Sequence, residues 1–258
     1  MKNITKNTNL MISIATIAAI FIIWFVATNF QLVDGRLIPT PQATWKAFLQ
    51  VTADYKGHSL LQHFGASMYR LLLAFALAAV TAVPIGLLSG YSDKVRAILT
   101  PVIEFYRPLP PLAYYTLLVL ALGIEDESKI ALLYLACFAP IYLACVSGVT
   151  KVKTDFILSA ATLGANKTQI FAKVIFPACL PEIFIGIRTA VGVAYTTLVS
   201  AEMVAASSGI GWMVLDAKNW FRNDIIFVGI IVMGVTGILI DFLLRLLEKK
   251  LVPWGGKV

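Results

Sequence analysis

The sequence is poor in charged residues and lacks the short motifs that mark nucleotide, metal or hydrolase chemistry. Charged residues make up 14% of its 258 residues and hydrophobic residues 59%, whereas soluble domains carry about 25% charged residues. It contains no G-x-x-x-x-G-K-[ST] phosphate loop, no H-E-x-x-H helix and no G-x-S-x-G elbow. An ordinary soluble enzyme is therefore excluded, and so is ATP hydrolysis by this chain alone.

Cysteine and histidine are also scarce, with three and two residues. Cys137, Cys145 and Cys179 lie in or beside apolar segments without metal-ligand spacing, as is typical of buried hydrophobic side chains. His58 and His63 are five residues apart and do not share a helix face, which argues against a metal site. Both histidines lie outside the apolar segments, so an intramembrane enzyme would lack its base.

Long apolar segments dominate what is present, and they predict an all-α membrane protein with six transmembrane helices. Most approach the roughly 20 residues that a helix needs to cross about 30 Å of hydrocarbon. The first is too long for an ordinary signal peptide and no clear cleavage site follows it, so we interpret it as a retained span. The third is short and follows three prolines. The segments are Leu10–Ala27, Leu71–Leu88, Leu112–Leu122, Ile130–Val149, Ile183–Ala206 and Ile225–Leu247.

The distribution of lysine and arginine predicts that both termini are cytoplasmic. Basic residues are concentrated on the side of the N-terminus, as the positive-inside rule requires. The net charge of +7 follows from this bias, and no basic cluster indicates nucleic acid. The inner segments hold Lys2, Lys6, Lys94, Arg96, Arg107, Lys151, Lys153, Lys167, Lys173, Arg245, Lys249, Lys250 and Lys257, and the outer ones Arg36, Lys46, Lys56, Lys129, Lys218 and Arg222.

The chain is expected to form a single transmembrane permease domain over residues 1–258. Its longest outer segment, residues 29–68, is predicted to contain a short interfacial helix around Ala43–Val51. Its longest inner segment, residues 151–182, combines basic residues with small ones. We expect Pro177 and Pro181 to end one helix of this segment and begin the next.

Ionisable residues within the spans are the candidates for a solute pathway, because burying charge in a bilayer is costly. Arg188, Tyr195 and Glu202 are seven residues apart and project from one face of the fifth span, with Thr196 beside them. In the alternative interpretation, Arg188 reaches the interface and Glu202 makes structural contacts. Asp241 lies four residues before Arg245, which predicts an ion pair within one helix.

Small residues recur at positions that allow helices to approach closely. Gly86 and Gly90 are four residues apart in the second span, and Gly186, Ala190 and Ala194 repeat the same spacing in the fifth. The spacing is compatible with packing within the bundle or between two copies of the chain.

The inner segment resembles the EAA loop of ABC importer permeases. The resemblance rests on Ala160-Ala161-x-x-Gly164-Ala165 followed by Ile170, Val174 and Pro177. It extends from about Leu37 onward, and the segment from Pro101 to Ala113 is similar to the corresponding one in taurine, aliphatic sulfonate and nitrate permeases. The taurine branch is the most similar. The coupling loop that this resemblance implies comprises Ser159, Ala160, Ala161, Gly164, Ala165, Ile170, Phe171, Val174 and Pro177.

Several positions depart from the family pattern. Ser159 replaces the usual acidic residue of the loop, and Phe176 the usual leucine before the proline. Tyr114 stands in a segment where the family has a tryptophan, and Tyr195 at a position where tryptophan is common. If these aromatic residues shape the pathway, the choice of substrate differs within the subfamily.

The resemblance implies a type I ABC importer permease in the bacterial inner membrane, with no enzymatic activity of its own. Two copies would form the pathway, two cytoplasmic ATPase subunits would bind ATP and Mg, and an extracytoplasmic solute-binding protein would deliver the cargo. The chain itself would bind no cofactor. The expected cargo is a small sulfonate, taurine first, with nitrate, bicarbonate or a pyrimidine precursor as alternatives. A stand-alone channel or secondary carrier is the alternative from another class.

Overall fold

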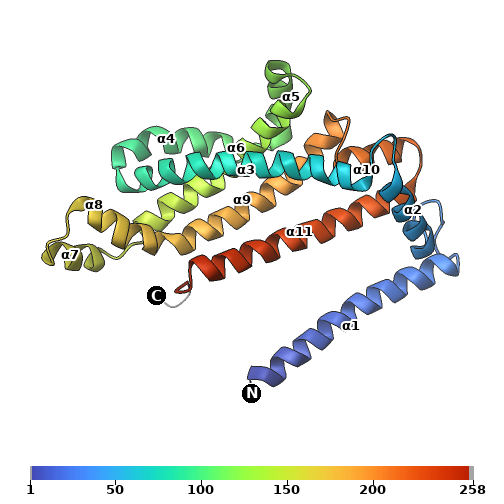
Figure 1. Cartoon of the computed structure of the whole chain (residues 1–258), viewed down its shortest axis with the longest axis horizontal. Coiled ribbons are helices and arrows are strands. Elements are labelled where there is room, and N and C mark those ends of the chain that lie inside the picture. Colours follow the sequence, from blue (N-terminus) through green and yellow to red (C-terminus); the bar gives the residue numbers. More distant parts are fainter. Residues whose placement is uncertain (1, 256–258) are drawn as a thin grey trace. The chain divides into compact units, whose positions relative to one another are not determined.

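The computed structural model describes residues 2–255, with the side chains of these apart from residues 2–7, 9 and 10. Within this range every regular element is a helix and no strand forms, which confirms the all-α class (Figure 1). Lys257 and the side chains of Lys2 and Lys6, counted above as inner charges, lie outside the described residues. The helices are α1 Lys2–Asn29, α2 Pro41–Ala53, α3 Leu60–Tyr91, α4 Asp93–Tyr106, α5 Pro111–Leu122, α6 Asp126–Thr150, α7 Thr154–Thr162, α8 Lys167–Ile170, the π-helix η1 Phe171–Ile175, α9 Phe176–Val204, α10 Ile210–Asn219 and α11 Asn223–Leu251.

Among the described residues, five helical stretches are long and apolar enough to cross a membrane. The segment predicted as the third span corresponds to α5, which has 12 residues and at 1.5 Å per residue is shorter than the hydrocarbon core. The count of six spans and the cytoplasmic termini therefore stay predictions. The five stretches are Met11–Asn29, Leu60–Tyr91, Asp126–Thr150, Lys167–Val204 and Asn223–Leu251.

The chain forms two compact units. The first comprises the described chain up to His63 together with Met213–Met233. In it, α2 confirms the short helix predicted around Ala43–Val51: the Thr40 hydroxyl accepts a hydrogen bond from the amide of Ala43, and Pro41 begins the helix. The Trp24 indole donates to the carbonyl of Pro39 at 3.0 Å and stacks on Phe227.

The second unit comprises Phe64–Trp212 and the described chain from Gly234 onward. Its core lies where α9 and α3 pack against α6, and small residues make this packing possible. A Cβ atom at Gly86 would lie 2.6 Å from Cβ of Cys145, and one at Gly90 equally close to Val149. A Cβ at Gly186 would overlap Ala144. The predicted close approach of helices therefore occurs within this unit, and the three cysteines are buried in it as expected.

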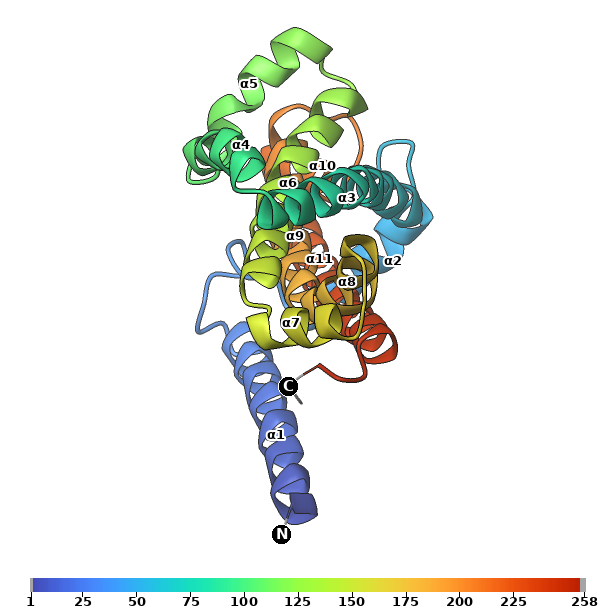
Figure 2. The same ribbon diagram turned by 90° about the vertical axis from the view of Figure 1, so that its left-hand side faces the viewer.

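Pro177 lies in the first turn of α9, as expected, but the expected break of the helical path is wrong. The path continues from Lys167 through η1 into α9 (Figure 1), and Pro181 lies inside α9. Figure 2 views the second unit from the end that carries α7 and α8. Proline cannot donate a backbone hydrogen bond, so the helix leaves the carbonyl of Pro177 without its usual partner at Pro181. The Trp254 indole donates to this carbonyl at 3.3 Å. A side chain from the C-terminal segment thus replaces the missing bond.

We expect Gly186→Ala to destabilise the second unit by about 1–3 kcal/mol, because the added methyl group must displace α6. Gly234→Ala is the matched control: it changes the same atoms on α11, where a Cβ meets nothing within 4 Å, and should stabilise by up to about 1 kcal/mol. Thermal denaturation of both variants in detergent measures the difference. Equal melting temperatures would contradict the packing argument.

Candidate functional site

The predicted coupling loop is a helix, a left-handed turn and a second helix, each fixed by local contacts. Gly164 has a φ of +83°, a conformation that side-chain-bearing residues rarely adopt. Its amide donates to the carbonyl of Ala161, and the amide of Ala165 to that of Ala160, which ends α7. Asn166 and Gln169 then form a reciprocal capping box that starts α8.

The first half of this loop is an exposed surface. No residue of α7 is buried, and Leu163, beside Gly164, is 88% exposed. Ser159, Ala161 and Gly164 are also exposed, and a Cβ at Gly164 would meet no atom within 4 Å. Exposed apolar and small residues on a fixed turn are typical of a protein interface.

The second half of the loop packs on the core of the second unit. Ile170 and Phe171 are partly buried against this core, and the Phe171 ring lies 6.1 Å from that of Tyr91 on α3. Val174 is partly buried in η1, and Pro177 is the second residue of α9. The predicted loop residues thus divide into an exposed turn and a partly buried second half that leads directly into α9.

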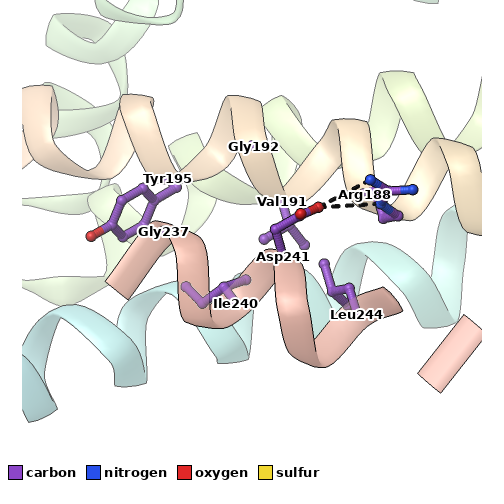
Figure 3. Close-up of a pocket in the computed structure, with 8 residues that line it drawn as sticks. All are labelled: Arg188, Val191, Gly192, Tyr195, Gly237, Ile240, Asp241 and Leu244. Carbon is purple, nitrogen blue, oxygen red and sulfur yellow. Dashed lines mark hydrogen bonds and ion pairs between the residues drawn. The ribbon is translucent and has the colours of Figure 1, made fainter. Parts of the chain in front are cut away.

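Two of the predicted pathway residues line one cavity. Arg188 and Tyr195 of α9 face α11 across a space of about 110 Å³, with Gly237 and Asp241 on the opposite side (Figure 3). Figure 3 shows the Arg188 guanidinium directed at the Asp241 carboxylate, and Tyr195 at the other end of the cavity. The two helices therefore present a cation, an anion and a phenol to one small space.

The charges of this cavity form a connected cluster. An Arg188 nitrogen lies 3.1 Å from Asp241 and another lies 3.5 Å from Glu248. Arg245 also binds Asp241, at 2.7 Å, which confirms the ion pair predicted within α11. Asp241 is thus shared by two arginines, a link between helices that the sequence spacing did not indicate.

Thr196 and Tyr114 lie away from this cavity. The Thr196 hydroxyl donates to carbonyl groups of its own helix, at Gly192 and Val193. Tyr114 on α5 packs beside the small cluster of Tyr115, Leu132 and Ala201. The structure brings neither residue to Arg188.

Glu202 is the centre of a buried polar network at the opposite end of α9 from the coupling loop. Its side chain is 1% exposed, and both carboxylate oxygens accept hydrogen bonds. The Ser67 hydroxyl donates at 2.8 Å, Arg70 at 2.7 Å and the amide of Gly211 at 2.9 Å. This network ties α9 to α3 and to the first turn of α10.

Arg70 is the member of this network that the sequence analysis missed. Besides Glu202, it binds Asp126 at 2.7 Å and the carbonyl of Ser208 at 2.8 Å, and it is 3% exposed. Gly209 completes the site, because a Cβ there would overlap the Glu202 carboxylate. An arginine next to an apolar run and a carboxylate within another were the available signal, since buried charges are nearly always paired.

The sequence is similar to several known proteins along almost its whole length. Residues 82–253 match the family described as binding-protein-dependent transport system inner membrane component. The chain is 39% identical to the taurine transport system permease protein TauC of Escherichia coli, covering 96% of this chain and 90% of that protein. It is 36% identical to the putative aliphatic sulfonates transport permease protein SsuC of Bacillus subtilis, covering 92% and 85%. It is 30% identical to the nitrate import permease protein NrtB of a Synechocystis strain, covering 92% and 87%.

Arg70→Met is expected to destabilise the protein by about 3–5 kcal/mol, because it leaves the Glu202 carboxylate buried without its cation. Arg96→Met, which removes the exposed partner of Asp93, is the control and should cost less than about 1 kcal/mol. Combining Arg70→Met with Glu202→Ala should cost less than the sum of the single changes. Thermal denaturation of the four variants measures this coupling, and strict additivity would contradict a shared network.

Proposed function

Because the chain belongs to the family of binding-protein-dependent transport system inner membrane components, we propose that it is the subunit through which an ATP-driven importer moves taurine into the cell. That it is a multi-pass inner membrane permease, and not an enzyme, follows from the family. We propose taurine as the cargo because the chain is similar to the taurine permease over 96% of its length. The relatives named for aliphatic sulfonates and nitrate make these the alternatives.

In the proposed transporter, the chain provides the pathway and its partners provide binding and energy. Two copies form the pathway, two cytoplasmic ATPase subunits bind ATP and Mg, and an extracytoplasmic solute-binding protein delivers the cargo. The exposed turn around Gly164 docks on an ATPase subunit, and the partly buried second half of the loop, from Ile170 to Pro177, passes its movement to α9. Alternating access then follows from the two arrangements of these helices.

We further propose that the cargo passes the Arg188 cavity. A guanidinium binds sulfonate oxygens well, and Asp241 lies on the opposite wall for an ammonium group. The burial of Glu202 supports a positioning role for this residue rather than direct lining of the pathway. Glu202→Ala is therefore expected to reduce uptake through loss of the network with Arg70.

The coupling role of the turn is tested by Gly164→Arg. We expect this variant to lose co-purification with the ATPase and at least 90% of uptake, because the change strains a left-handed residue and adds bulk to the docking surface. Gly57→Arg is the matched control, since Gly57 has a φ of +89° and equally open surroundings. It should show similar strain but normal ATPase binding. Intact uptake by Gly164→Arg would rule out the coupling role.

The choice of cargo is tested with the purified transporter in liposomes, together with the ATPase and the solute-binding protein from the same organism. Taurine should stimulate ATP hydrolysis at least tenfold more than nitrate at equal concentration. Titration of the binding protein with taurine, alkanesulfonates and nitrate should give the same order. If nitrate stimulates ATP hydrolysis more strongly than taurine does, the proposed cargo is wrong and the chain is a nitrate permease.

A further inference from the structure

The turn between α10 and α11 displays a large aromatic side chain on an unfavourable backbone. Phe221 is 90% exposed, and its φ of +54° lies in the left-handed region, which bulky side chains rarely adopt. Trp220 beside it is 65% exposed. Neither burial nor local preference accounts for an aromatic residue at this position.

Polar contacts on both sides of Phe221 hold the turn in place. The backbone amide of Arg222 donates to the carbonyl of Ala217. The Arg222 guanidinium binds Asp224 and the side-chain oxygen of Gln50, each at 2.9 Å. The side-chain amide of Asn223 donates to the backbone carbonyl of Arg36. The strained conformation is therefore imposed by its surroundings, all of them within the first unit.

A second set of contacts fixes Trp220. Asp216 accepts hydrogen bonds from Tyr55 at 2.7 Å and Lys56 at 2.9 Å, and the Lys56 ammonium lies 4.5 Å from the centre of the Trp220 ring. Burial and the bond to Asp216 raise the pKa of Tyr55 above its ordinary value. Burial opposes ionisation of Asp216, but the bonds from Lys56 and Tyr55 outweigh it and hold the pKa of Asp216 below its ordinary value. Asp216 is therefore ionised and Tyr55 protonated at neutral pH, and the contacts that fix Trp220 are in place.

The surface around the aromatic pair is charged and hollowed. A groove of about 740 Å³ lies beside Phe221, lined among others by Arg36, Leu37 and Asp224, whose carboxylate is paired with Arg222. Arg36 and Lys218 are exposed and form no ion pair with the residues that the structure describes. Exposed rigid aromatic residues with a charged rim are characteristic of the energetic centres of protein interfaces.

We propose that Phe221 and Trp220 are the anchor by which the first unit docks the solute-binding protein, through an apolar pocket with an acidic rim on that partner. This inference rests on the proposed function, and the charge distribution predicts that the turn faces outward. A preorganised anchor loses less entropy on binding a rigid protein pocket, which gives a reason for holding an aromatic side chain on a fixed left-handed backbone.

The test replaces the strained aromatic residue by the residue that its backbone prefers. Phe221→Gly should relieve strain, so the protein should melt at an equal or higher temperature, yet bind its solute-binding protein at least tenfold more weakly. Gln31→Gly is the matched control: Gln31 is exposed, in the same unit, with a φ of 56°, and its replacement should relieve strain and leave binding unchanged. Binding is measured by titrating the solute-binding protein from the same organism onto the transporter in nanodiscs, with the ATPase present.

If Phe221→Gly binds the solute-binding protein as tightly as the wild-type chain does, this inference is overturned and the proposed function is left intact. A changed oligomeric state on size exclusion would assign the pair to contact between copies and would also overturn it. If the wild-type chain assembles with the ATPase but binds no solute-binding protein, both the inference and the proposed import function fail. Lys218→Glu gives an independent measurement: reversal of this exposed charge should slow association at low salt, and an unchanged or faster rate would contradict the acidic rim on the partner.

Discussion

The contact between α6 and α9 is the constraint on which the second unit depends. Glycine at position 186 lets α9 approach Ala144 and the carbonyl of Pro140, and Gly148 on α6 receives Cys179 and Glu182. Contacts of this kind leave little space for α9 to shift on α6 without repacking. The packing thus joins the turn around Gly164, before α8, to the Glu202 network near the end of α9 through one continuous helical path.

Hydropathy and small-residue spacing were sufficient to predict much of this fold. Each long apolar segment became a helix, and the spacing of Gly86, Gly90 and Gly186 correctly indicated close packing. The break expected at Pro177 and Pro181 does not occur. The rule that proline interrupts a helix applies to an isolated helix, and it omits the hydrogen bond that a distant side chain donates here. Trp254, which donates to the carbonyl of Pro177, lies 77 residues further along the chain. The π-helix η1 keeps the path helical up to α9. Neither compensation has a local signal.

The sequence was sufficient to predict which charged residues would form polar sites within the spans, but it did not predict which residues they would contact. Glu202 and Arg188 were found because charges within apolar segments are costly. Arg70, the partner of Glu202, is 132 residues away in sequence, and nothing local joins them. Asp241 was assigned to Arg245 by helical spacing, and Arg188 was added only by the packing of α9 on α11. The strain at Phe221 was equally hidden, because a backbone angle imposed by surrounding contacts leaves no mark on the residue type.

The charge balance of the Arg188 cluster favours one kind of cargo over another. Two arginines, 188 and 245, are balanced by the carboxylates of Asp241 and Glu248, so the cluster is neutral. In the proposed transporter, an anion such as nitrate that bound Arg188 would displace a carboxylate and leave it with fewer cations. A zwitterion such as taurine would offer a sulfonate to Arg188 and an ammonium group to the displaced carboxylate. It would exchange ion pairs without losing any, so the charge balance of this cavity agrees with the cargo proposed from the sequence similarity.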